Sequence, residues 1–143
     1  MSDERLIKQF HLQVNTELES LTAVLQWFER STQAFVPQQT FWQCQVALTE
    51  GFTNTVRHAH RGLPTTTKID LEISIFTNCL EMRIWNWGQP FNLNSALKYS
   101  HEQHLFDENG RGLFFMQKLT DEIEYIRVAK RRNCLIMRKK TGS

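Results

Sequence analysis

Apolar side chains recur at helical spacing in two stretches of the first sixty residues. The first helix is expected to run to about Ser31, with Asn15 or Thr16 as its N-cap. Pro37 separates it from a second helix, predicted over residues 39–59. The buried stripe of this second helix is expected to comprise Phe41, Cys44, Leu48, Phe52, Val56 and Ala59.

Alternating apolar and polar positions predict strands in the rest of the chain. The expected strands are residues 6–14, 68–76, 80–87, 122–128 and 134–138. A third helix is expected from Gly110 to Leu119, after a polar loop of about 17 residues between Asn92 and Glu108 that is long enough to be a lid. Hairpin-linked strands with helices between them predict one α+β domain over residues 1–143. Its architecture would be a two-layer sandwich with a mixed sheet and helices on one face.

Composition narrows the choice of partners. The formal net charge of +2 gives no electrostatic case for nucleic acid as the main partner. No apolar run approaches the roughly 20 residues of a membrane span, and the charged N-terminus has no apolar segment typical of a signal peptide. Three widely spaced cysteines favour reduced thiols. We therefore expect a cytoplasmic protein that binds neither nucleic acid nor membrane.

Polar side chains form a row on the second predicted helix. Glu50, Asn54 and His58 lie four residues apart, so an α-helix would stack them on one face, roughly opposite the apolar stripe. The small residues Ala47 and Gly51 are expected on the same face, where they would leave room for a ligand. The row taken alone is equally typical of a solvated helix face.

Two glycine motifs follow this row along the chain. At the end of a predicted strand, Asn86 precedes Gly88, which permits a sharp exit into a Gln-Pro-Phe turn. Beyond the long loop, Gly110, Arg111 and Gly112 open a helix. Glycines at a helix N-terminus allow close approach of the backbone, and the free N–H groups there favour phosphate. Each motif alone is also typical of an ordinary turn.

The order of these features resembles the Bergerat-fold (GHKL) ATPases, the superfamily of gyrase B and the histidine kinases. Glu50 and Asn54 match its N-box, NWGQPF its first glycine box and NGRGLFFM its second. Within the superfamily, TEGFTNTVRHAH and GQPF are most similar to the anti-sigma factor serine kinases of the RsbW and SpoIIAB type. A histidine-kinase catalytic domain is disfavoured, because no helix with a phospho-accepting histidine precedes the domain in this sequence.

The resemblance implies an ATP- and Mg²⁺-dependent protein-serine kinase. Glu50 would be the general base, Asn54 would coordinate Mg²⁺, and Arg111 would neutralise charge on the γ-phosphate. The implied nucleotide-binding residues are Asn54, Asn86, Gly88, Phe91, Gly110, Arg111, Gly112, Leu113 and Cys134. The implied partners are a STAS-domain anti-anti-sigma protein, a sigma factor and, as the family often dimerises, a second copy of the chain.

One residue departs from the family pattern. At position 86 the family has an aspartate that accepts a hydrogen bond from the adenine amino group, whereas this chain has Asn86. An asparagine keeps one acceptor oxygen but adds two N–H donors. The alternative is therefore a nucleotide-weak or nucleotide-free binding module of the same fold that acts by partner sequestration.

Four histidines raise the separate alternative of a zinc site. They are His58, His60, His101 and His104. No cysteine or acidic residue stands at convincing ligand spacing beside them, so scattered surface histidines are favoured.

Overall fold

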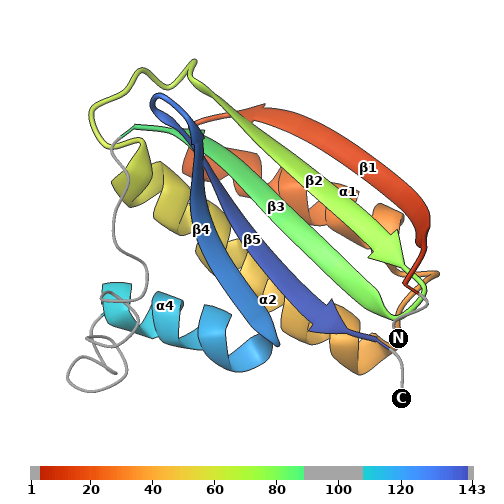
Figure 1. Cartoon of the computed structure of the whole chain (residues 1–143). Coiled ribbons are helices and arrows are strands. Elements are labelled where there is room, and N and C mark those ends of the chain that lie inside the picture. The colour runs from red at the N-terminus through yellow and green to blue at the C-terminus, as the bar shows by residue number, and fades with distance from the viewer. Residues whose placement is uncertain (1–3, 89–107, 142–143) are drawn as a thin grey trace.

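The computed structural model describes residues 4–88 and 108–141 (Figure 1). Its elements in chain order are β1 (Leu6–Asn15), the 3-10 turn η1 (Leu18–Ser20), α1 (Leu21–Thr32), α2 (Gln38–Asn54), the π-helical turn η2 (Thr55–Ala59), β2 (Lys68–Phe76), β3 (Cys79–Trp87), α4 (Glu108–Leu119), β4 (Glu122–Ala129) and β5 (Arg132–Lys140). All five predicted strands are present, and the bounds of β2 are those that the alternation predicts.

The strands form one sheet in the order β1-β2-β3-β5-β4, with α1, α2 and α4 on one face (Figure 1). The α+β two-layer architecture is confirmed. The sheet differs from the expected mixed one, since every neighbouring pair among these strands is antiparallel. Hairpins join β2 to β3 and β4 to β5, which requires antiparallel pairing, and β5 lies between β3 and β4.

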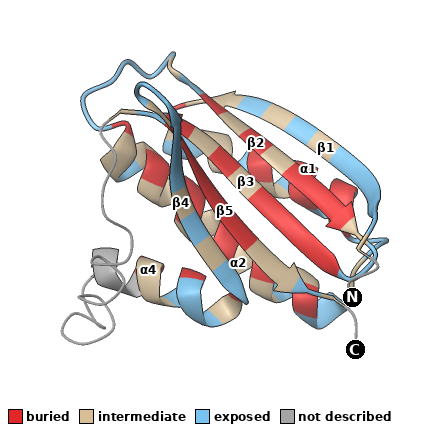
Figure 2. Cartoon of the chain, viewed as in Figure 1, coloured by how far each residue is buried: buried red, intermediate tan, exposed pale blue. Residues whose placement is uncertain are grey.

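The core lies between the sheet and the helices, where buried residues of both layers face each other (Figure 2). From α2 it takes the predicted Cys44, Leu48 and Phe52, which are fully buried. Gly51 is also in this layer: a Cβ atom there would lie 2.8 Å from Ile84 Cδ1. The expectation that Ala47 and Gly51 leave room for a ligand is therefore wrong, because Ala47 is fully buried in the core and Gly51 lets α2 approach the sheet.

The predicted start of the first helix is also wrong. Thr16 does not cap a helix, because its hydroxyl donates to the carbonyl of Thr67 at 2.6 Å and contacts the ring of His60. The chain makes η1 first, and α1 begins at Leu21 after Ser20. The side chain that would have capped the helix instead ties the end of β1 to the segment before β2.

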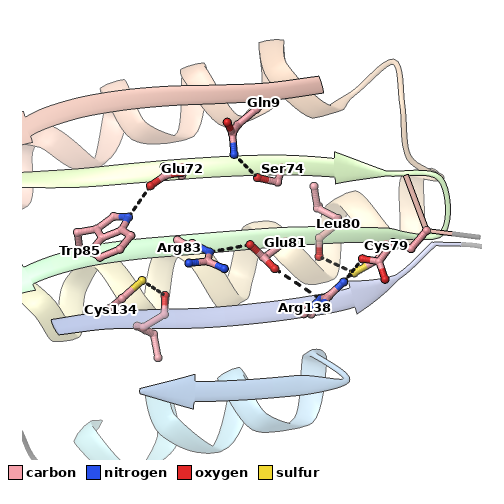
Figure 3. Close-up of polar contacts among 12 residues, drawn as sticks. Gln9, Glu72, Ser74, Cys79, Leu80, Glu81, Arg83, Trp85, Cys134 and Arg138 are labelled. Atoms are coloured by element: carbon pink, nitrogen blue, oxygen red, sulfur yellow. Dashed lines mark hydrogen bonds and ion pairs between the residues drawn. The ribbon is translucent and has the colours of Figure 1, made fainter. Parts of the chain in front are cut away.

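The other face of the sheet carries a layer of polar contacts (Figure 3). The Trp85 indole N–H donates to Glu72 at 2.7 Å, and Glu81 pairs with both Arg83 and Arg138. Cys134 is the cross-strand partner of Trp85 and lies on this face with it. These contacts link β2, β3 and β5 on the side away from the helices.

Candidate active site

Helices α2 and α4 meet at the polar row predicted from the sequence. Glu50 and Asn54 lie one turn apart on α2, and both are half-buried. A Cβ atom at Gly112 of α4 would lie 2.7 Å from Glu50 Oε2 and 3.9 Å from Asn54 Oδ1. The structure therefore brings together the acid, the amide and the second glycine motif. Only glycine leaves the Glu50 carboxylate this close to the backbone of α4.

The remaining residues of the second glycine motif lie on the same helix. Gly110 and Arg111 belong to the first turn of α4, which is described from Glu108. Leu113 is half-buried and packs against the core. Phe91 and residues 92–107 of the predicted lid lie outside the described residues.

Asn86 lies at the end of β3, on the face that packs against the helices. The residue is 1% exposed, and its Oδ1 accepts hydrogen bonds from the Tyr125 hydroxyl at 3.0 Å and from Asn133 Nδ2 at 3.3 Å. Asn133 is its cross-strand partner on β5 and also donates to the carbonyl of Gly88 at 3.3 Å. The end of β3 thus holds a cluster of two buried amides and a half-buried phenol.

On β5, Asn133 and not the predicted nucleotide-binding residue Cys134 lies on the side of the helices. Leu135 and Met137 face Gly51 of α2, so alternation along β5 puts Asn133 on the helix side and Cys134 on the opposite side. Burial raises the pKa of Cys134 to about 12, so it stays a neutral thiol. Sequence reasoning missed Asn133, although a polar residue at an inward position of an alternating strand is a usable signal.

Gly88 and His60 fix the chain where it leaves β3. Gly88 has φ +119°, and a Cβ atom there would lie 2.7 Å from the carbonyl oxygen of Ala59. One residue earlier, the Trp87 backbone N–H donates to His60 Nε2 at 2.8 Å. The strand end is therefore attached to the turn that follows α2.

The protonation state of His60 follows from its two partners. Because the Thr16 hydroxyl donates to Thr67, His60 Nδ1 must carry the proton and donate to Thr16 Oγ1 at 2.8 Å. Burial, with a smaller effect of the nearby Arg132 charge, lowers the pKa of His60 to about 4. His60 is thus a neutral, buried connector, a role that the sequence did not reveal.

Comparison with known proteins agrees with this arrangement. Residues 14–139 match the family model of the histidine kinase-like ATPase domain. The chain belongs to this family. The resemblance to the Bergerat-fold ATPases inferred from the motifs is therefore confirmed.

Two curated relatives of this ATPase domain carry the name serine-protein kinase RsbW, and both come from Bacillus licheniformis, one of them from strain ATCC 14580. Each is 31% identical to the chain over 86 residues. The match covers 55% of this chain and 53% and 52% of the two relatives. The chain thus spans about half the length of the curated relatives it matches.

The described part of the ATPase domain has no cluster of side chains that could hold a metal ion around the other histidines considered for a zinc site. His58 lies half-buried in η2, while His101 and His104 lie outside the described residues. Within residues 4–88 and 108–141, no three histidine, cysteine or acidic side chains are placed to hold a metal ion. Over the same ranges no helix is long and apolar enough to cross a membrane.

Proposed function

We propose that this domain is an ATP- and Mg²⁺-dependent protein-serine kinase. Its substrate would be a STAS-domain anti-anti-sigma protein, and it would also sequester a sigma factor in a cytoplasmic partner-switching system. The observation that carries the proposal is the convergence of Glu50 and Asn54 of α2 on Gly112 of α4. The names of the two relatives, both serine-protein kinases, support the same assignment.

The donor set of the site fits a magnesium nucleotide. The carboxamide oxygen of Asn54 is a hard ligand of the kind Mg²⁺ takes, and Mg²⁺ when bound would neutralise phosphate charge. The first turn of α4, which carries Gly110 and Arg111, offers free backbone N–H groups to phosphates. At the other end of the site, the amides of Asn86 and Asn133 can pair with a base. We assign the role predicted for Cys134 at this end of the site to Asn133.

Glu50 would perform the one proton transfer that the reaction needs. It would accept the proton of the partner's serine hydroxyl as the serine oxygen bonds to the γ-phosphorus. The bond from that phosphorus to the β,γ-bridging oxygen breaks at the same time, and ADP leaves. Phosphoryl transfer depends mainly on positioning and charge stabilisation, so one well-placed carboxylate is sufficient.

Calorimetric titration with ATP and ADP, with and without Mg²⁺, tests the proposal. We expect micromolar ATP affinity that requires Mg²⁺. The isosteric Glu50→Gln variant should keep this affinity and lose phosphotransfer to a cognate STAS protein, since the amide cannot accept the proton. Absence of binding at millimolar ATP would sink the kinase assignment, and comparable turnover by the variant would remove Glu50 from the role of base.

The second candidate function is a binding module that works without nucleotide. The presence of Asn86 where the family has an aspartate favours it, since a buried amide lacks the carboxylate that would accept from adenine. The titration separates the two candidates. A module of this kind would bind its partner with equal affinity in the presence and absence of ATP and Mg²⁺.

A further inference from the structure

The orientation of the Asn133 amide is fixed by its neighbours. One end of this amide lies 3.3 Å from the carbonyl oxygen of Gly88 and 3.3 Å from Asn86 Oδ1. A backbone carbonyl can only accept a hydrogen bond, so the group facing Gly88 must be the amino group of Asn133. The carbonyl end, Oδ1, therefore points away from both partners.

The orientation of Asn86 follows from that of Asn133. Its Oδ1 receives the Asn133 amino group and the Tyr125 hydroxyl. Burial raises the pKa of Tyr125, so this hydroxyl keeps the proton that it donates. A carboxamide oxygen has two lone pairs, and both are used here. Asn86 therefore has no acceptor left for a ligand, and what it can still offer is an N–H donor.

Asn133 Oδ1, in contrast to Asn86 Oδ1, receives no hydrogen bond from the described residues. The residue is fully buried, and this oxygen has no hydrogen-bond partner within the described ranges. Buried polar atoms are nearly always paired, and one that is unpaired in a native fold calls for an explanation such as a ligand. The two asparagines are joined by a single hydrogen bond instead of the two of a closed amide pair. The unpaired acceptor thus belongs to the cross-strand partner of Asn86, an amide whose own oxygen is already used.

We propose that Asn133, and not Asn86, accepts the hydrogen bond from the adenine amino group, while the Asn86 amino group donates to the ring nitrogen N1 beside it. The assignment rests on the proposed nucleotide site and identifies the residue that determines its base specificity. The hydrogen-bond acceptor for adenine, which the family has at position 86 on β3, would here be supplied by the neighbouring strand β5. Exchanging the roles in this way keeps adenine recognition without a buried carboxylate.

A chemical double-mutant cycle tests the assignment. ATP is compared with purine riboside triphosphate, which lacks only the amino group of the base, by calorimetry in the presence of Mg²⁺. Wild-type protein should bind ATP roughly ten- to a hundred-fold more tightly, the usual cost of leaving a buried acceptor unpaired. Asn133→Leu removes the acceptor and should bring the ratio of the two affinities close to one.

A further variant makes the comparison specific. Ile136→Val changes a residue of the same strand on the opposite face and should keep the wild-type ratio. Circular dichroism verifies that each variant is folded.

The outcomes separate the assignment from the function on which it rests. If wild-type protein binds neither nucleotide, the proposed function itself fails. If it binds both with a ratio near one, or if folded Asn133→Leu keeps the wild-type ratio, Asn133 is not the acceptor although the site binds nucleotide.

A measurement on the wild-type protein covers the case in which Asn133→Leu does not fold. The side-chain carbonyl ¹³C resonance of Asn133 should move on addition of ATP and move less on addition of purine riboside triphosphate. A response confined to Asn86 would assign the acceptor to Asn86 and overturn the proposal.

Discussion

At the scale of the residue, Gly112 controls where the Glu50 carboxylate can lie. A methyl group at this position would stand 2.7 Å from Glu50 Oε2, well inside van der Waals contact. The carboxylate is the end of a flexible side chain, so we expect it to move while the helices stay in place. Alanine also gains about 0.5–1 kcal/mol over glycine in a helix, which offsets the crowding. Fold stability and catalysis should therefore respond differently.

We expect Gly112→Ala to change the free energy of unfolding by less than about 1 kcal/mol. If Glu50 is the base of the proposed kinase, the same substitution should lower phosphotransfer about a hundred-fold, as for a catalytic group displaced by about 1 Å. Urea unfolding and single-turnover transfer to the partner protein measure the two effects. In the Glu50→Gln background the same substitution should cause no further loss of transfer. Wild-type transfer rates in Gly112→Ala would contradict the role of this contact.

At the scale of the element, α2 shows what the sequence could and could not predict. The apolar stripe at Cys44, Leu48 and Phe52 was predicted correctly, because helical periodicity is a local signal. The helix was predicted to continue to Ala59, but the α-helical part ends at Asn54 and the backbone widens into the π-turn η2 from Thr55 onward. His60 N–H bonds the carbonyl of Thr55, five residues back, and no composition signal marks such a turn.

Some functional residues could not be predicted because their contacts join segments that are distant in the sequence. The strands were predicted because alternation is visible within nine residues, but the pairing of Asn133 with Asn86 depends on the register between β3 and β5. The contact of His60 with Thr16 likewise joins positions 44 residues apart. The first glycine motif and the N-box could be found from their residues alone, whereas the groups that hold them are brought together only by the fold.

The close contact of Gly51 in α2 with the sheet predicts how a larger residue at this position affects the stability of the fold. Gly51→Ala would place a methyl group 2.8 Å from Ile84 Cδ1, 3.1 Å from Leu135 and 3.2 Å from Met137. Overpacking of this kind costs about 1–3 kcal/mol, more than the gain in helix propensity. Ile84→Val removes the nearest of these atoms at a cost of about 0.5–1.5 kcal/mol alone. We expect the double variant to be about 1 kcal/mol more stable than the sum of the single effects.

Chemical denaturation of the four proteins measures this coupling. Gly62→Ala is the matched control, because Gly62 has φ +82° and no atom within 4 Å of a Cβ atom built on it. Its cost comes from the backbone and should add to that of Ile84→Val without coupling. Simple additivity of Gly51→Ala with Ile84→Val would show that α2 does not press on the sheet at Ile84.

At the scale of the whole molecule, His60 joins three segments that are distant in sequence. It connects the end of β1 through Thr16, the turn after α2 through its own backbone, and the end of β3 through Trp87. The bond to Thr16 requires a proton on Nδ1, and the bond from Trp87 requires an unprotonated Nε2, so the two together require a neutral ring. Protonation of Nε2 would place a donor against the Trp87 N–H and a charge in a buried position. The stability of the domain should therefore depend on pH through this residue.

The direction of this pH dependence follows from how many protons the folded and the unfolded protein bind. Unfolded His60 takes a proton below about pH 6.5, whereas burial lowers the pKa in the folded state to about 4. Between these values the unfolded state binds more protons, so the free energy of unfolding falls as the pH falls from about 6.5 to 4, by at most about 3 kcal/mol. Burial alone would raise the pKa of Asp70, but hydrogen bonds from Gln13 and Arg132 and the charge of Arg132 lower it overall, so the ion pair of Asp70 with Arg132 responds in a lower pH range.

Urea unfolding between pH 7.5 and 4.5 measures this dependence, and His60→Gln provides the comparison. Glutamine carries both an acceptor for the Trp87 N–H and a donor, but it does not titrate. We expect the variant to be less stable than wild-type protein at pH 7, because one side chain cannot reproduce the ring geometry, and to lose stability less steeply below pH 6.5. The two curves should approach each other near pH 4.5. Parallel curves would mean that His60 is not the group that titrates, and that the three segments are held together without it.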